Sequence, residues 1–264
     1  MEFTSPLEKK LSQSYLECGR VINSVENLDG LHQIRSSFCK WSQAYLGSSE
    51  TVNESDWLNG MHTRIEVAEL NDLRLYLIGQ MNESPSFREL LFSLAKGTIE
   101  AIVGNELAMQ ARVNLSIQMP EDDSSLLHTH ADTWSGDSPF EAVLWLPLVD
   151  VYETKSMYLL PPAANQRLNE DFKNLAGASS DSLFENIRSE VEWIKVNYGN
   201  FLLFNQTLPH GNRVNEEPET RWSLNCRFKS VFSPYGDKKL GEFFHPISLK
   251  AASRIGLGYD YPSA

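Results

Sequence analysis

The sequence contains few cysteines and no long hydrophobic segment. Its three cysteines, Cys18, Cys39 and Cys226, form no CxxC pair, which argues against a disulfide scaffold and indicates a reducing compartment. No apolar run approaches the ~18–20 residues of a membrane-spanning helix. The N-terminal residues lack the basic and apolar regions of a signal peptide. We therefore expect a cytoplasmic protein without a membrane partner.

The chain also lacks a cluster of basic residues. Its 23 Lys and Arg are outnumbered by 35 Asp and Glu, so the formal net charge is −12. Such a surface repels nucleic acid, and an anionic small molecule would have to be met by local basic groups. With 264 residues, 41% of them apolar, the chain is long enough for one sizeable core. We predict a single domain over residues 1–264, as a monomer or homodimer.

Apolar periodicity divides the chain into a helical part and a strand-rich part. Residues 6–46, 56–82 and 84–104 have the spacing of amphipathic helices, so residues 1–104 are expected to form a helical layer. From residue 107 to 119 the pattern changes to the alternation of a half-buried strand. Further strands are expected at 126–132, 140–151, 157–160, 191–196, 201–205 and 221–232.

Two further segments complete this division. A helical insertion is expected at about 165–190, and the tail 236–264 has the composition of an irregular wrap. About eight short strands preceded by helices are typical of an α+β protein with a jelly-roll core, here placed at residues 105–235.

Three residues have the chemistry of a metal site. His130 and Asp132 are two residues apart in the expected strand 126–132, so their side chains would point the same way, and His210 could add a third ligand. Two histidines and one carboxylate on one face of a metal are the facial triad of non-haem Fe(II) oxygenases. Zinc could bind the same ligands. His128 has the same parity, so a His128–His130 pair without Asp132 is an alternative.

An arginine and a serine lie shortly after the third ligand. Arg221 follows His210 by eleven positions, and Ser223 would share its strand face. A guanidinium can hold a carboxylate through two parallel hydrogen bonds, and the Ser223 hydroxyl can add a third. A dicarboxylate that chelates the metal through a keto-acid end would fit both groups, and 2-oxoglutarate is such a molecule.

The motif His-x-Asp, a distant His and Arg-x-Ser resembles the 2-oxoglutarate/Fe(II) dioxygenases. The flanking sequences, HADTWSGDSPFEAVLWLPLVD at 130–150 and GNFLLFNQTLPHGNRVNEEPETRWSLNCRFKS at 199–230, resemble the branch found in bacterial carbohydrate-biosynthesis clusters, which is distantly similar to the phytanoyl-CoA hydroxylase type. The resemblance covers roughly residues 107–235. It implies a double-stranded β-helix core and the use of Fe(II), 2-oxoglutarate and O2. In a halogenase, the position of the carboxylate ligand is left vacant for chloride. The presence of Asp132 at this position therefore argues against halogenation.

The resemblance also implies further contacts. A polar residue before the His-x-Asp motif would bind the metal-side carboxylate, and Gln118 and Asn114 are the candidates. Trp145 is expected in the core. For Arg227, structural hydrogen bonding within the barrel is as good an interpretation as substrate contact. The candidates for substrate binding are His128, Trp134, Asn212, Arg213, Asn225 and Arg227.

The function that the resemblance implies is oxidation of a small polar metabolite. A sugar, an aminocyclitol or a nucleotide sugar would be hydroxylated, although desaturation or epimerisation is also compatible. One alternative is an oxygenase acting on an amino acid or an acyl thioester. An alternative from another class is a non-catalytic jelly-roll protein that binds a metal or a sugar.

Overall fold

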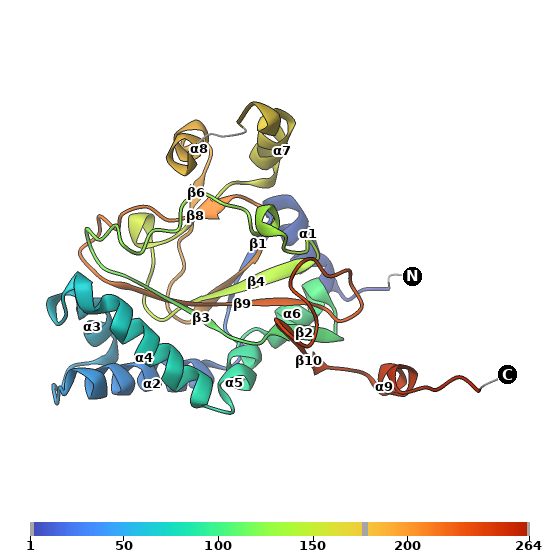
Figure 1. Ribbon diagram of the computed structural model, residues 1–264, viewed down its shortest axis with the longest axis horizontal. Helices are drawn as coiled ribbons and strands as arrows, with labels where there is room; N and C mark the ends of the chain where they lie inside the picture. Colours follow the sequence, from blue (N-terminus) through green and yellow to red (C-terminus); the bar gives the residue numbers. More distant parts are fainter. Residues whose placement is uncertain (1–2, 176–178, 263–264) are drawn as a thin grey trace.

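The computed structural model describes residues 3–175 and 179–262 of the chain. The helices are α1 (Pro6–Cys18), α2 (Leu28–Leu46), α3 (Glu54–Asn59), α4 (Leu70–Glu83), α5 (Phe87–Ser93), α6 (Lys96–Val103), α7 (Pro162–Asp171), α8 (Ser180–Ile187) and α9 (Ala251–Leu257). The strands are β1 (Arg20–Ser24), β2 (Leu107–Gln110), β3 (Asn114–Gln118), β4 (Glu141–Pro147), β5 (Tyr158–Leu159), β6 (Glu192–Trp193), β7 (Asn200–Asn205), β8 (His210–Gly211), β9 (Arg221–Ser230) and β10 (Phe244–Ser248). In Figure 1 the strands occupy the middle, with α2 to α5 on one side and α7 and α8 on the other.

Seven strands form one large sheet. Its hydrogen-bonded path runs β1-β7-β4-β9-β2-β10, and β3 also pairs with β9. The neighbouring strands are antiparallel. β4 lies between β7 and β9, and all seven of its residues are buried. Because both faces of this central strand are covered, it appears in the sequence as a continuous apolar run instead of an alternating one.

The two faces of β9 have different partners, because successive side chains of a strand point to opposite sides. On one face, Trp222 donates its indole N–H to the carbonyl of Leu58 in α3 at 2.9 Å, and its ring meets that of Phe38 in α2 edge-on. On the other face, Arg221 and Arg227 line a cavity. The N-terminal helices therefore cover one side of β9 and leave the other side to polar groups.

A smaller sheet lies between the large sheet and α7 and α8 (Figure 1). It contains the short strands β6, β5 and β8 in that order. β8 begins at His210, whose backbone also forms an antiparallel bridge with His130. The hydrophobic core includes Leu159 of β5 together with Leu203 of β7 and Leu144 of β4, so the two sheets share one packed interior.

The N-terminal region contains the strand β1, within residues that the apolar periodicity of the sequence had predicted to be helical. Gly19 ends α1 with a left-handed backbone (φ 69°), which favours glycine. A Cβ at this position would also lie only 2.2 Å from Cδ1 of Leu208. The next residues, β1, then pair with β7, with Val21 opposite Leu203. The prediction that residues 6–46 are entirely helical is wrong here, because the chain turns at Gly19 and the free edge of β7 is beside it.

Two other expected helices are interrupted. Residues 56–82 form α3, the 3-10 turns η1 (Met61–Thr63) and η2 (Val67–Glu69), and then α4. The Gly60 carbonyl accepts a hydrogen bond from the Arg64 guanidinium at 2.7 Å, and the intervening Met61 packs in the core. Residues 84–104 likewise divide into α5 and α6. Apolar spacing continued through these turns, which is why it indicated longer helices.

The C-terminal tail is not an irregular wrap. β10 pairs with β2 and buries Phe244, which contacts Ala108 and Val231. Beyond it α9 points away from the rest of the chain (Figure 1) and has no buried residue. The end of the expected wrap, residues 263–264, lies outside the described residues. Among the described helices, none has the length and hydropathy needed to cross a membrane.

Candidate metal centre and adjoining cavity

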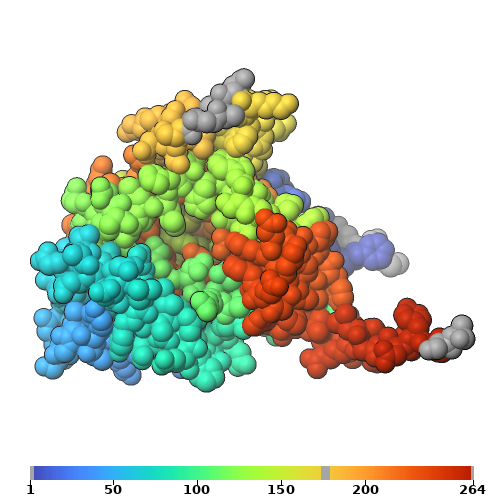
Figure 2. Space-filling model, in the orientation of Figure 1, coloured from blue at the N-terminus to red at the C-terminus, as the bar shows by residue number. Residues whose placement is uncertain are grey.

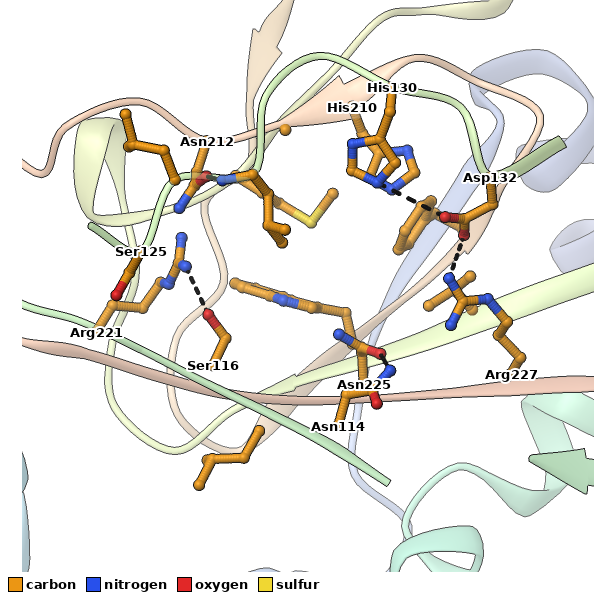
Figure 3. Close-up of a pocket in the computed structure, with 18 of the residues that line it drawn as sticks. Asn114, Ser116, Ser125, His130, Asp132, His210, Asn212, Arg221, Asn225 and Arg227 are labelled. Carbon is orange, nitrogen blue, oxygen red and sulfur yellow. Dashed lines mark hydrogen bonds and ion pairs between the residues drawn. The ribbon is translucent and has the colours of Figure 1, made fainter. Parts of the chain in front are cut away.

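Three possible metal ligands converge at one side of a cavity. The ligand atoms of His130, Asp132 and His210 all lie within 4.8 Å of one another. Two backbone hydrogen bonds, of 3.0 and 2.8 Å, hold His130 beside His210, and their ring centroids are 4.4 Å apart. Asp132 begins the 3-10 helix η3 (Asp132–Ser135), and its Oδ1 lies 3.6 Å from Nε2 of His130. Figure 3 shows the three side chains together.

Backbone carbonyls orient both imidazoles. Nδ1 of His130 lies 2.7 Å from the carbonyl oxygen of His128, and Nδ1 of His210 lies 2.9 Å from that of Leu208. A carbonyl oxygen only accepts hydrogen bonds, so this geometry assigns the proton to each Nδ1 and leaves the lone pair on each Nε2. Metal-binding histidines are commonly fixed in this way.

Burial and neighbouring charged groups shift the pKa values of His210 and Asp132. Burial lowers the pKa of His210 to about 4, so this imidazole is neutral at physiological pH. Burial alone would raise the pKa of Asp132, but His210, Arg227 and His130 outweigh it and hold that pKa below its usual value. An ionised carboxylate with imidazole nitrogens is a donor set that fits divalent iron and also zinc.

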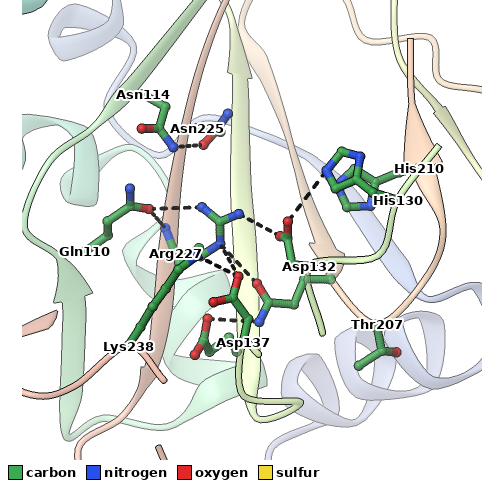
Figure 4. A network of polar contacts seen from close by, with 12 residues as sticks. Gln110, Asn114, His130, Asp132, Asp137, Thr207, His210, Asn225, Arg227 and Lys238 are labelled. Atoms are coloured by element: carbon green, nitrogen blue, oxygen red, sulfur yellow. Dashed lines mark hydrogen bonds and ion pairs between the residues drawn. The ribbon is translucent and has the colours of Figure 1, made fainter. Parts of the chain in front are cut away.

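Arg227 fixes the second oxygen of Asp132. Its Nη2 lies 2.8 Å from Oδ2 of Asp132, and both side chains are mostly buried. The remaining nitrogens of this guanidinium face Gln206, Gln110 and Asp137, and Figure 4 shows this network behind the carboxylate. Because Oδ2 is held by Arg227, Oδ1 is the oxygen directed toward the imidazoles.

A second arginine lies across the cavity from the histidines (Figure 3). Arg221 is buried and donates to the carbonyl of Ser156 at 3.2 Å and to Oγ of Ser116 at 2.9 Å. Its Nε is buried without a hydrogen-bond partner, and so is the hydroxyl of Ser223. Burial lowers the pKa of Arg221 to about 10, which still leaves it charged at neutral pH.

No carboxylate pairs with Arg221 among the residues that the structure describes. A buried charge without a counter-charge is strongly unfavourable, and unpaired buried donors such as Arg221 Nε and the Ser223 hydroxyl add to that cost. A carboxylate bound at this end of the cavity would supply the negative charge that Arg221 lacks. The residues at this end of the cavity therefore fit the far carboxylate of 2-oxoglutarate.

The cavity between the two ends has a volume of about 460 Å³, a size typical of small-molecule sites. Trp145, for which the core was preferred to the pocket, is buried and also lines this cavity. Asn114 donates from Nδ2 to Oδ1 of Asn225 at 2.8 Å. The candidate residues that line the cavity are His130, Asp132, His210, Arg221, Asn114, Asn212, Asn225 and Arg227.

Two co-substrate candidates are not part of the lining. Gln118 is fully buried, and its amide donates to the carbonyl of Arg213 at 2.6 Å and accepts from Asn212 at 3.1 Å. This carboxamide braces the segment after His210, whereas Asn114, on the same face of β3, reaches the cavity. Ser223 is also absent from the lining, although its hydroxyl has no partner.

Three substrate candidates also lie outside the cavity. The expected strand 126–132 is not present. Its residues are irregular apart from the bridge at His130 and the 3-10 helix that begins at Asp132, so strand parity does not apply. His128 is exposed and lies 3.8 Å from Asp181 in α8, which Arg213 also contacts at 2.7 Å. Trp134 packs against Phe172, with ring centroids 5.1 Å apart. These residues contact the helical insertion instead.

Several lining residues were not identified from the sequence. Ser116, the partner of Arg221, shares the face of β3 with Asn114, and this parity was the available signal. Arg74 comes from α4, at a position in an amphipathic helix that apolar residues usually occupy. Ser125 lies in the loop before His130 and has a buried hydroxyl without a partner. No sequence pattern indicated that a loop residue such as Ser125 would reach the site.

Sequence comparison finds no match for this chain, neither to a protein-family model nor to a curated protein. Structure comparison does find similar proteins. EctD from S. alaskensis with bound Fe has 13% identity and a TM-score of 0.57, over 89% of this chain and 81% of EctD. HygX from Streptomyces hygroscopicus, with nickel and 2-oxoglutarate bound, has 13% identity and a TM-score of 0.56, over 90% of each chain.

A third similar structure is SnoK, described as a non-heme alpha ketoglutarate dependent carbocyclase from nogalamycin biosynthesis. It has 14% identity and a TM-score of 0.55, over 91% of this chain and 96% of SnoK. At such identities the likeness concerns the fold alone. The chain therefore has the jelly-roll fold of the non-haem iron and 2-oxoglutarate-dependent oxygenases.

Proposed function

We propose that this protein is an Fe(II)- and 2-oxoglutarate-dependent oxygenase. His130, Asp132 and His210 would hold the iron, and Arg221 with Ser223 would hold the far carboxylate of 2-oxoglutarate. The observation that carries the proposal is the buried Arg221, which faces the histidine cluster across one cavity and has no carboxylate partner among the described residues. A protein that binds only a metal or a sugar has no need for such a cation.

Iron and 2-oxoglutarate, when bound, would supply the oxidation: one atom of O2 converts the keto acid to succinate and CO2, and the other oxidises a C–H bond. The protein's own residues bind and orient the reactants. The carbonyls of His128 and Leu208 fix the imidazoles, and Arg227 fixes Asp132. Arg221 would set the direction of the keto acid.

The substrate in this proposal is a small polar metabolite, most simply a sugar or a sugar derivative. Polar groups on the cavity wall, including the amides of Asn114 and Asn225, support a polar substrate. The structural relatives do not agree on a substrate, since EctD is described with 5-hydroxyectoine and SnoK as a carbocyclase. We also propose that the chain is one domain, because helices and strands contribute to the same core cluster.

Anaerobic titration of the apoprotein with Fe(II) and then 2-oxoglutarate tests the proposal. We expect a visible metal-to-ligand charge-transfer band, which requires a keto acid to chelate an iron with open positions. Asp132→Ala should abolish the band by removing a ligand. Iron binding without any band in the wild-type protein would contradict the proposal and favour a zinc-type or non-catalytic site.

The variant Arg221→Gln tests 2-oxoglutarate binding separately from iron binding. Loss of a charge-assisted, two-pronged contact should weaken 2-oxoglutarate binding roughly 10- to 100-fold while iron binding is retained. Arg112→Gln is the matched control, because Arg112 is exposed and outside the cavity lining. If Arg221→Gln abolished iron binding and left the 2-oxoglutarate requirement unchanged, the assigned role would be wrong.

A further inference from the structure

Arg74 is a charged residue on the buried face of a helix. In α4 the buried residues include Leu70, Leu73 and Leu77. Residues three and four apart share a helix face, and Arg74 is four residues after Leu70 and three before Leu77. It is half-buried and lines the same cavity as the histidine cluster. Apolar residues usually occupy such positions, so a charged side chain here suggests a functional role.

The guanidinium of Arg74 has only a neutral partner. Its Nη2 donates to Oδ1 of Asn71 at 3.0 Å, and no carboxylate pairs with it within residues 3–175 and 179–262. Figure 2 shows the surface hollowed between the blue-green segment that contains α4 and the green segment above it. Arg74 and Ser124 line the cavity from these two segments.

Each of the other charged groups of the loaded cavity would have an oppositely charged partner. The charged side chains that line it, within the described residues, are Arg74, Arg221, Arg227 and Asp132. The two charges of Fe(II) would be met by Asp132 and the metal-side carboxylate of 2-oxoglutarate. The far carboxylate would neutralise Arg221. Arg227 is in an ion pair with Asp132 at 2.8 Å, and its Nε lies 3.8 Å from Oδ2 of Asp137, which Lys238 also contacts at 2.7 Å. Arg74 is the lining cation that is left without a negative charge.

We propose that Arg74 forms a subsite for an anionic group, a carboxylate or a phosphate, on the molecule that is oxidised. This inference rests on the proposed function and narrows its substrate class. A chain with a net charge of −12 repels anions over most of its surface, so a local cation is required to admit one. The same cation disfavours aminocyclitols and other positively charged substrates. Acid- or phosphate-bearing sugars are the class that fits.

The test uses small anions as probes on the full-length protein, saturated with Fe(II) and 2-oxoglutarate without O2. Inorganic phosphate and acetate are titrated separately by calorimetry at constant ionic strength, up to about 50 mM, where a site of millimolar affinity would be filled. At least one anion should bind to the wild-type protein, and the preferred one distinguishes a phosphate subsite from a carboxylate subsite. Arg74→Gln should weaken that binding roughly tenfold or more, and Arg112→Gln should leave it unchanged.

The outcomes of the experiment distinguish a failure of this inference from a failure of the proposed function. The charge-transfer band should persist in Arg74→Gln, since Arg74 touches neither the metal ligands nor Arg221. If neither anion binds, or if both bind equally to the wild-type and Arg74→Gln proteins, the anionic subsite is refuted while the band still supports the oxygenase. If the wild-type protein shows no band, the proposed function fails, whatever the anions do.

Discussion

Arg221 and Arg227 lie six residues apart on one face of β9, yet their partners differ. Arg227 is paired with Asp132 and surrounded by acceptors, whereas Arg221 has no anionic partner among the described residues. At the scale of single residues, this difference between a paired and an unpaired cation is the basis of the two different roles that we propose. Arg227, which was a substrate-binding candidate, is better explained as a residue that positions Asp132.

Arg227→Gln should weaken metal binding because Oδ2 of Asp132 would lose its ion pair and the carboxylate its fixed direction. Changes in residues that orient metal ligands commonly lower metal affinity about 10- to 100-fold. Calorimetric titration with Fe(II) or Ni(II) measures the effect. Arg227→Lys keeps the charge and should recover part of the affinity, and unaltered circular dichroism would show that the variants fold. Equal metal affinity in the wild-type and Arg227→Gln proteins would refute the positioning role.

At the scale of elements, β10 and α9 are adjacent in the chain but differ in what they stabilise. Phe244 of β10 is fully buried among aromatic and aliphatic neighbours, whereas α9 has no buried residue and exposes Ile255 and Leu257. Only burial against the sheet removes apolar area from water, so only β10 is expected to contribute strongly to folding.

Phe244→Ala should therefore lower the free energy of unfolding by about 3–5 kcal/mol. Truncation after Lys250, which removes α9, should change it by less than about 1 kcal/mol. Urea denaturation followed by circular dichroism measures both. A large loss of stability on removing α9 would mean that this helix packs against something in solution, and a small effect of Phe244→Ala would mean that β10 is not held to β2.

At the scale of the whole molecule, metal and co-substrate should stabilise the fold. The metal ligands come from two distant parts of the chain, His130 with Asp132 and His210, so the unfolded chain cannot assemble the site, and binding shifts the folding equilibrium. At a concentration of about 100 times Kd, a ligand adds about 2.7 kcal/mol, which corresponds to a rise in Tm of roughly 5–10 °C for a protein of this size. Scanning calorimetry with Ni(II) and 2-oxoglutarate measures the shift.

A chelator should reverse that rise, and Asp132→Ala should show little of it. If the melting temperature of Asp132→Ala rose as much as that of the wild-type protein, the metal would be binding elsewhere. Arg221→Gln should retain the rise caused by the metal and lose most of the further rise caused by 2-oxoglutarate.

The sequence predicted the strand-rich core and the identity of the cluster well, for a physical reason. Strands such as β4 and β7 bury most of their residues, so their apolar runs are visible without knowledge of neighbours. The His-x-Asp spacing identified two residues that do lie beside His210, but it predicted the wrong local structure. His130 is in a bridge and Asp132 in a 3-10 turn, so His128 lies outside the cavity despite its matching parity.

The residues alone determined which side chains have the chemistry of a metal and keto-acid site. That information is local, because it depends on residue types and on short spacings such as Arg-x-Ser. Only the tertiary structure decided which polar groups have partners. Arg227 meets Asp132, Gln118 meets Asn212, and Arg74 meets the cavity, each across a long separation in sequence. The cost of a buried charge depends on what surrounds it in space, and spacing along the chain does not contain that information.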